Sequence, residues 1–464
     1  MYEKVKNGLL LCKLVIASLP NSIDPRAINM EDDLSTNYSK QIDNLSLMVN
    51  AARCKGANMG NVDINELNIG NKFAILNCVW QIIRIGFFNQ VNIYHHPEII
   101  HLKRFHESIE DLKELSVSDI VLRYVNFHLA NNDFRYFMND FDDDFKNCLL
   151  YAHLLYRVCP VNLRMKMTDP LTISEEKCVE ARARDIVSNL KVLNAESFVT
   201  EDDLLNGNKR RDSSYKLHLS TMIYLFIYYN GDLSIHVPTH RTKGYGTAGE
   251  LLDEVVCKSF LNSFDVYPFT NHLVSDCRNG WILSEMFEIL KPGVTSEMRF
   301  TLDFDIDRLH DQRLQNNRKI VKLCQLLSLD VCNVEAEPLT KSDKPTLISI
   351  ILEMMRYYFC RDNISQRFII ESINCLIKKR NSKAFIYTLT DKAVIEENML
   401  AAVIGNKAPG LINEDCLNND KLQNCRYLIS IAHKAGIPIY TLPEHFMDGN
   451  APFISIAFAT LLYY

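Results

Sequence analysis

Four histidines lie within one polar stretch of the chain, and histidines at short spacing are common ligands of zinc and other transition metals. They are His95, His96, His101 and His106. A hydrolytic zinc site on a helix would need the pattern His-Glu-x-x-His, which Pro97-Glu98 does not complete. Neither a carboxylate nor a cysteine stands beside the histidines at ligand spacing. We therefore interpret this stretch as a polar linker and expect no metal site.

Two acidic runs resemble calcium-binding loops, which place oxygen ligands at alternate positions. The run at 140–144 has Phe145 where such a loop needs glycine, and Tyr151 where it needs a bidentate glutamate. The run at 303–307 fails at the same two positions. We predict that the protein is not controlled by calcium and carries no cofactor.

Other kinds of chemistry find no support in the sequence. The 14 cysteines are scattered without a Cys-x-x-Cys pair, which favours reduced, buried thiols in a cytosolic protein. There is no glycine-rich phosphate loop and no Gly-x-Ser-x-Gly motif, so we predict that the protein is not an enzyme. The formal charge of −6 argues against nucleic acid as a partner. No apolar stretch reaches the roughly 18 residues that span a bilayer, so we expect a soluble, cytoplasmic protein without membrane insertion.

One motif recurs along the chain and organises it. An asparagine opens an apolar segment, and a proline follows it by thirteen positions. The copies begin at Asn7, Asn147, Asn279 and, in a weaker form, Glu396. Self-similarity at a fixed spacing predicts repeated domains. Four copies without a catalytic centre predict a multivalent protein that connects other molecules.

Each copy predicts the same series of helices. An amphipathic helix follows the motif, as at 44–48 before Gly56, and an acidic turn leads into a last helix that is apolar almost all round and therefore buried. Asp343 and Asn450 precede first-turn prolines and are expected to cap two of these last helices. A further amphipathic helix is expected ahead of the motif at 120–129, 251–264 and 368–377. No strand-like alternation recurs, so the predicted fold is all-α.

The first copy departs from this plan, because only six residues precede Asn7. We expect its leading helix to be absent. Either the chain as given starts late, or another surface covers the gap.

The repeated unit resembles the calponin-homology domain, and the order of the four units is similar to that of the fimbrin (plastin) family. One departure is Tyr124, which stands where this family usually has tryptophan. The segments that carry the resemblance are 7–14, 22–29 and 79–87 in the first unit, 122–129 in the second, 268–273 and 290–293 in the third, and 409–413 and 440–444 in the fourth. Together they cover nearly the whole chain.

The resemblance implies four tandem calponin-homology domains arranged as two actin-binding pairs. We place the first domain at 1–92, a linker at 93–116, the second domain at 117–232, a second linker at 233–246, the third domain at 247–360 and the fourth at 361–464.

The resemblance also implies a function. Fimbrins bind actin filaments through both pairs and cross-link the filaments into bundles, so the expected partner is filamentous actin, bound by a monomer in the actin cytoskeleton. In this family the filament-facing surface includes the leading and last helices of the first domain of each pair and the leading helix of the second. Carried over, these are residues 80–88 and 120–127 in the first pair and 251–261 and 354–360 in the second. The candidate contact residues within them are Arg84, Phe87, Phe88, Arg123, Lys258 and Arg356.

Some residues in these segments have an alternative interpretation as part of the domain core. Trp80, Ile82 and Ile83 fit a domain core better than a binding surface. A rival hypothesis for the whole chain is a calponin-homology scaffold that binds one filament, a microtubule or a signalling partner through the second pair only.

Overall fold

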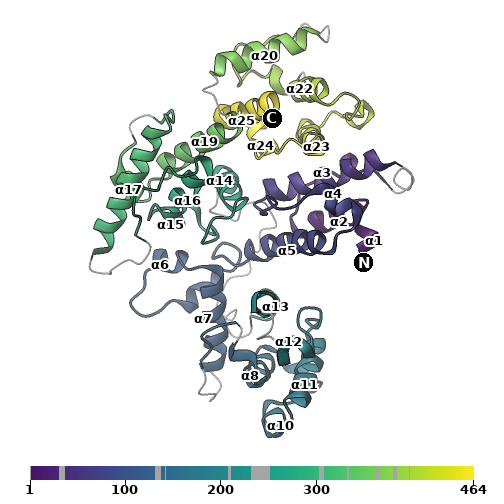
Figure 1. The fold of residues 1–464 in the computed structure, drawn as a ribbon, viewed down its shortest axis with the longest axis vertical. Helices are drawn as coiled ribbons and strands as arrows, with labels where there is room; N and C mark the ends of the chain where they lie inside the picture. The colour runs from purple at the N-terminus through teal and green to yellow at the C-terminus, as the bar shows by residue number, and fades with distance from the viewer. Residues whose placement is uncertain are drawn as a thin grey trace. The chain divides into compact units, whose positions relative to one another are not determined.

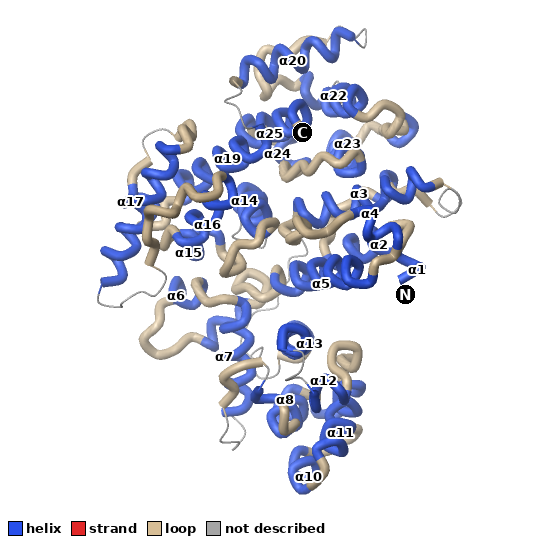
Figure 2. The backbone as a smooth tube through the Cα atoms, viewed as in Figure 1, coloured by secondary structure: helices blue, strands red, loops and turns tan. Residues whose placement is uncertain are grey.

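The computed structural model describes residues 2–30, 37–130, 137–141, 143–206, 211–230, 251–301, 308–331, 334–360, 365–379, 384–396 and 398–464. All regular structure in these ranges is helical (Figure 2), so the predicted all-α fold is confirmed. The chain divides into two compact units (Figure 1). One contains Met1–Gly86 together with Glu250–Tyr464, and the other contains Phe87–Gly249.

The first unit of structure holds the predicted first, third and fourth domains. The helices of the first domain are α1 (Tyr2–Val5), α2 (Leu9–Ser18), η1 (Pro25–Ala27), α3 (Tyr38–Cys54), α4 (Ile64–Ile69) and α5 (Lys72–Phe88), whose last two residues belong to the other unit. The third domain has α14 (Leu252–Asn262), α15 (Leu273–Cys277), α16 (Trp281–Leu290), α17 (Leu309–Leu326), α18 (Ala336–Thr340) and α19 (Lys344–Cys360). The fourth has α20 (Gln366–Lys379), α21 (Ala393–Glu396), α22 (Met399–Lys407), η8 (Glu414–Cys416), α23 (Lys421–Lys434), α24 (Pro443–Met447) and α25 (Ala451–Tyr463).

The second unit of structure holds the predicted second domain and the stretch before it. Its helices are η3 (Pro97–Leu102), α6 (Ile109–Lys113), α7 (Val117–Ala130), η4 (Asp143–Phe145), α8 (Leu149–Val158), α9 (Val161–Arg164), α10 (Pro170–Glu175), α11 (Val179–Val192), α12 (Glu201–Asn206) and α13 (Arg211–Tyr228). The stretch predicted as a polar linker is therefore ordered. It buries Ile99, Leu102 and Leu112, and η3 packs against α7.

Three expectations from the sequence concern segments outside the described ranges.

 The predicted linker at 233–246, the acidic run at 303–307 and the junction near Arg361 all lie in parts of the chain that the structure does not describe.

The asparagine motif has a specific backbone geometry. The Oδ1 atoms of Asn7 and Asn279 accept hydrogen bonds from the N–H groups two residues later, at 3.1 and 2.9 Å. Gly8 and Gly280 then adopt left-handed backbone with φ of 75° and 76°. A Cβ on Gly8 would lie 2.8 Å from the Cβ of Asn44 in α3, so only glycine fits this contact. The motif is thus the start signal of α2 and α16, and α8 begins in the same way after Asn147.

A second asparagine, on the helix after the motif, ties each domain together. In the third domain the fully buried Asn316 accepts from the Thr301 N–H at 3.1 Å. Its Nδ2 donates to the carbonyl oxygens of Thr301 and Asn279 at 2.9 and 3.0 Å. Equivalent bridges to a loop backbone are made by Asn44, Asn189 and Asn424. Each one satisfies buried backbone groups that no helix could pair.

The last helices differ in how deeply they are buried. In the fourth domain α25 is buried from Phe453 to Leu461, with α20 packed against it, and α14 packs against α19 in the same way. On α5, however, Phe73 is 85% exposed and Leu76 is 50% exposed. The expectation that all four last helices are buried all round is therefore wrong for α5.

Within the described residues, only the four-residue α1 stands ahead of the first motif.

One of the two predicted caps is confirmed. The Asp343 carboxylate accepts from the Thr346 N–H at 3.0 Å at the start of α19. The other is wrong, because Asn450 makes no side-chain cap to α25. Its Nδ2 atom instead donates to the Oδ1 of Asp253 in the third domain, at 3.3 Å.

Replacing Asn316 with alanine removes three buried hydrogen bonds and leaves the Thr301 backbone unpaired. We expect Asn316→Ala to lower the free energy of unfolding by about 2–4 kcal/mol. Urea unfolding followed by circular dichroism measures the change. The matched control is Gln315→Ala, because Gln315 is exposed on the same helix. Equal stability of the two variants would contradict this role for Asn316.

Candidate functional site

The three candidate residues at the end of α5 lie in different surroundings. Arg84 is half-buried, and its guanidinium carbon lies 5.6 Å from the ring centroid of Phe269 in the third domain. Phe87 is also half-buried, and its ring centroid lies 5.8 Å from that of Phe198 in the second unit of structure. Phe88 is buried. The end of α5 therefore presents less apolar surface than its sequence predicts.

The candidate on α7 is engaged in an ion pair. Both terminal nitrogens of Arg123 donate to the carboxylate of Glu107, at 2.6 Å each. This bidentate hydrogen bonding lowers the pKa of Glu107 to about 2. Arg123 thus fixes the segment between η3 and α6 onto α7.

The candidates in the third domain lie on two helices that pack against each other, α14 and α19. Lys258 is only 7% exposed, and its Nζ donates to the Asn271 carbonyl oxygen at 3.4 Å. The side chain of Arg356 is 30% exposed, with its Nη2 3.4 Å from the Glu353 carboxylate. Arg356 also lines a groove of about 420 Å³ between the third and fourth domains. It is therefore the more accessible cation of the two.

A surface that the sequence did not predict joins the first domain to the fourth. In Figures 1 and 2, α3 and α23 run side by side, although they are far apart in the sequence. Asn50 on α3 donates to the His433 carbonyl oxygen at 3.0 Å. The Lys434 ammonium donates to the Ala27 carbonyl oxygen at 2.9 Å and to the Asn29 Oδ1 at 2.8 Å. We call this contact the α3–α23 seam.

Arg26 in η1 extends the α3–α23 seam. Its guanidinium donates to the carbonyl oxygens of Cys416 and Gln423, at 2.8 and 2.7 Å. Asp24 holds the same guanidinium through its carboxylate at 2.7 Å, and the Asp24 N–H donates to the Ser430 hydroxyl at 2.9 Å.

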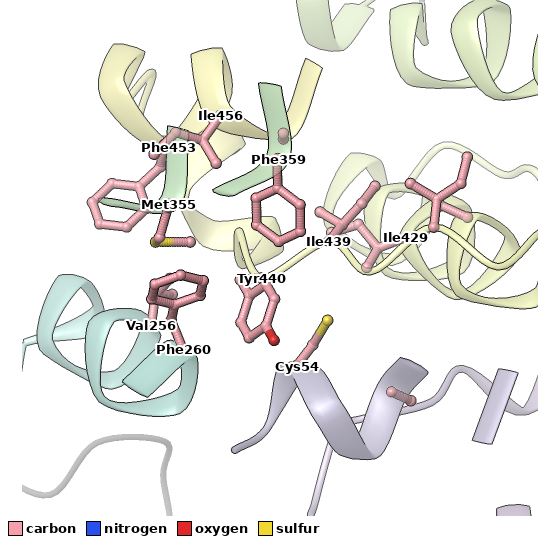
Figure 3. Close-up of a cluster of buried hydrophobic side chains, with 14 of the residues drawn as sticks. Cys54, Val256, Phe260, Met355, Phe359, Ile429, Ile439, Tyr440, Phe453 and Ile456 are labelled. Carbon is pink, nitrogen blue, oxygen red and sulfur yellow. The ribbon is translucent and has the colours of Figure 1, made fainter. Parts of the chain in front are cut away.

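At one end of the α3–α23 seam the third domain joins the contact. Figure 3 shows the Tyr440 ring between Phe260, Phe359 and Cys54, which belong to the third and first domains. Its ring centroid lies 5.5 Å from that of Phe260 and 5.9 Å from that of Phe359. The Tyr440 hydroxyl donates to the Ser263 hydroxyl at 2.7 Å. One tyrosine of the fourth domain thus contacts both other domains of this unit.

Comparisons with known proteins show which proteins this chain is similar to. A family model described as the calponin homology (CH) domain matches residues 1–87. Plastin-1 of Bos taurus is 27% identical over all of this chain and 74% of its own length. Fimbrin-4 of Arabidopsis thaliana is 24% identical over all of this chain and 71% of its own length. Over its whole length the chain is similar to fimbrins and plastins.

The fold of the family is also matched in a solved structure. The crystal structure of the actin-crosslinking core of Schizosaccharomyces pombe fimbrin aligns with this chain at a TM-score of 0.80 and 20% identity. The alignment covers all of this chain and 92% of the other. The four tandem calponin-homology domains predicted from the sequence are confirmed. Because fimbrins and plastins are structural proteins, the prediction that the chain is not an enzyme is confirmed as well.

The histidine-rich stretch and the apolar helices can now be compared with the expectations from the sequence. Within the described ranges, no three histidine, cysteine, aspartate or glutamate side chains are placed to hold a metal ion. His96 of the histidine-rich stretch is instead buried beside Glu98, with 2.8 Å between its Nδ1 and the carboxylate. None of the described helices is long and apolar enough to cross a membrane.

The α3–α23 seam had one signal in the sequence. An amphipathic helix buries one face, but α3 is buried at every position from Asn44 to Ala52, and α23 at every position from Tyr427 to Lys434. Runs such as Leu428-Ile429-Ser430-Ile431-Ala432 offer no polar face for water. Such a helix must be covered on a second side, but the sequence does not say by which domain.

The Arg123–Glu107 pair predicts a pH-dependent stability. Because the pKa of Glu107 falls from 4.5 to about 2 on folding, its contribution is complete above pH 4.5 and is lost as the pH falls toward 2. We expect Glu107→Gln to lower the free energy of unfolding by about 1–3 kcal/mol at pH 7, and this difference to shrink at pH 3. Urea unfolding at both pH values tests it, with Glu110→Gln as the exposed control on the same segment. A difference that is equally large at both pH values would contradict the assignment.

The α3–α23 seam predicts that Arg26→Ala loosens the fourth domain. The substitution leaves the Cys416 and Gln423 carbonyl oxygens without their donor from the first domain. We expect faster amide hydrogen exchange in α3 and α23 and a loss of about 1–3 kcal/mol in the free energy of unfolding. Arg367→Ala is the control, because Arg367 is exposed and pairs only within α20. Unchanged exchange in α3 and α23 would show that the contact does not hold the two domains together.

Proposed function

We propose that the chain binds actin filaments and cross-links them into bundles. The observation that carries this proposal is the collinear match of the whole chain. Plastins and fimbrins align with all of it, and the solved protein that aligns at a TM-score of 0.80 is described as an actin-crosslinking core. Fold likeness alone does not determine function. The similarity in sequence to plastins and fimbrins over the whole chain supplies the remaining support.

A cross-linker needs two filament-binding sites on one molecule. When one site has bound, the other is held near the filament lattice, which raises its effective concentration. The proposed sites lie at the end of α5 with α7, and on α14 with α19. Arg123 holds the segment ahead of its domain, and Lys258 holds a loop of its own domain. We therefore assign the larger contact role in the third domain to Arg356.

We further propose that bundling by this chain is independent of calcium. The support comes from the sequence, where the run at 140–144 lacks the glycine and the glutamate of a calcium loop. The protein is proposed to act as a monomer in the actin cytoskeleton, with both sites on one chain.

Sedimentation with filamentous actin tests the function. We expect the chain to pellet with actin at low speed, as bundles do, and equally with calcium or a calcium chelator. Pelleting at high speed only would favour the rival hypothesis of a scaffold that binds one filament. No pelleting at either speed would refute the proposed function.

The contact residue is tested by charge reversal. Arg356→Glu reverses the charge of the proposed contact and places a carboxylate beside Glu353, so we expect affinity for actin to fall by about tenfold, or about 1.4 kcal/mol. Lys341→Glu is the matched control, since Lys341 is exposed at the end of α18, outside the proposed surface. High-speed sedimentation over a range of actin concentrations measures both. Equal affinity of the two variants would remove Arg356 from the site.

A further inference from the structure

A pair of aromatic side chains stands exposed on the fourth domain, in the segment that follows α20. Phe385 is 57% exposed and Tyr387 is 79% exposed, and their ring centroids lie 5.0 Å apart. Ile386 between them is fully buried, so the two rings point away from the core. Asn374 of α20 accepts from the Ile386 N–H at 2.9 Å and donates to the Ile386 carbonyl oxygen at 2.8 Å. The backbone that carries both rings is therefore fixed before anything binds to them.

The equivalent segment of the third domain already contacts another domain. There Asn262 of α14 bridges both backbone groups of Thr270, at 2.8 Å each. Phe269 comes directly before Thr270, and the guanidinium carbon of Arg84, from the first domain, lies 5.6 Å from the Phe269 ring centroid. Phe385 holds the equivalent place in the fourth domain, where more than half of its surface is open to solvent. This position of the fold is thus suited to contact with another surface.

Three lysines lie beside the aromatic pair. Lys378 and Lys379 end α20, and the first of them is one helical turn beyond the asparagine that holds the segment. Lys392 follows Asp391, whose carboxylate accepts from the Tyr387 N–H at 2.6 Å. All three lysine side chains are exposed, and none forms an ion pair with another described residue. We call the two rings and the three lysines the fourth-domain patch.

The stability of the fold accounts for only part of the fourth-domain patch. Cations in the last turn of a helix interact favourably with its dipole, which explains Lys378 and Lys379. Lys392, however, comes directly before α21, where the same dipole disfavours a cation. The exposed parts of Phe385 and Tyr387 add no buried apolar area to the core. Binding to another surface explains this combination better than folding does.

The fourth-domain patch needs an occupant that is anionic at its surface and apolar just below it. The three lysines repel a cation such as the guanidinium that lies over Phe269. An acidic peptide would attract the lysines, but it offers no continuous apolar layer to two adjacent rings. A bilayer with acidic phospholipids offers phosphate groups to the lysines and, at its interface, the depth at which aromatic side chains settle. We propose that the fourth-domain patch is a peripheral binding surface for membranes that contain acidic phospholipids.

This contact gives the chain a second kind of partner. None of the five side chains lies on the helices proposed to contact actin, so the contact does not depend on whether the chain binds filaments. Three lysines and two rings give weak, reversible binding, because each lysine near an anionic surface contributes only on the order of 1 kcal/mol. The attraction is screened by salt, since all three lysines are exposed.

Vesicle flotation of the full chain tests the proposal. We expect the chain to float with vesicles of phosphatidylcholine and phosphatidylserine, and not with vesicles of phosphatidylcholine alone. Raising the sodium chloride concentration to about 0.5 M should release it. Flotation with both kinds of vesicle alike, or with neither, would overturn the proposal.

Charge reversal locates the cations of the fourth-domain patch. The double variant Lys378→Glu/Lys379→Glu should weaken binding to the phosphatidylserine vesicles by at least about tenfold. Lys341→Glu, at the exposed end of α18, is the matched control and should leave binding unchanged. Equal loss in the double variant and the control would refute the assignment. If the wild type does not float and the double variant loses low-speed pelleting with actin, the patch belongs to the filament contact instead.

The rings are tested separately. Phe385→Ser/Tyr387→Ser should weaken vesicle binding by about tenfold and leave its dependence on salt unchanged, because the lysines remain. Phe105→Ser is the control, since Phe105 is 92% exposed in the second unit of structure. Both changes replace exposed side chains, and urea unfolding should show the wild-type transition for each. Vesicle binding that is insensitive to the loss of both rings would contradict the proposed surface.

Discussion

The docking of the first domain on the fourth depends on a lysine ammonium that is almost out of contact with water. Lys434 is 8% exposed, and burial lowers the pKa of its amine. A buried charge without partners costs several kcal/mol. Its ammonium donates to the Ala27 carbonyl oxygen and to the Asn29 Oδ1, and both acceptors come from the first domain. The fourth domain therefore satisfies this lysine only when the two domains are docked.

The acceptor at Asn29 is itself held by the framework that all four domains share. Asn44 accepts from the Asn29 N–H and donates to its carbonyl oxygen, as Asn316 does with Thr301 in the third domain. The Asn29 Nδ2 donates to the Lys40 carbonyl oxygen, which turns its Oδ1 toward Lys434. The same internal bridge thus supports an intradomain loop in one domain and an interdomain contact in another. The two domains differ in the residue that the bridge holds, which is Asn29 in the first domain and Thr301 in the third.

The features that could be predicted from the sequence are those with local causes. The capping asparagine and the left-handed residue after it set the starts of α2, α8 and α16, and both stand within three residues of the helix they begin. The burial of Arg123 could not be predicted, because its partner Glu107 lies 16 residues away on an irregular segment. The α3–α23 seam was even harder to predict from the sequence, because its hydrogen bonds join residues as much as 407 positions apart. A charged residue on an amphipathic helix is expected to point away from the domain core. The pattern does not show whether a segment from elsewhere in the chain packs over that residue.

The separation of 407 positions across the α3–α23 seam has a consequence for synthesis. At about 5–20 residues per second, the fourth domain leaves the ribosome roughly 20–80 s after the first. Through that interval the apolar side of α3 that α23 will cover, with Leu47 and Ala51 among its buried residues, has no permanent partner. Such a surface is a substrate for chaperones and a point of entry for aggregation in the nascent chain. The first domain is made well before the fourth, and its α3 is among the last helices of this unit to reach its final packing.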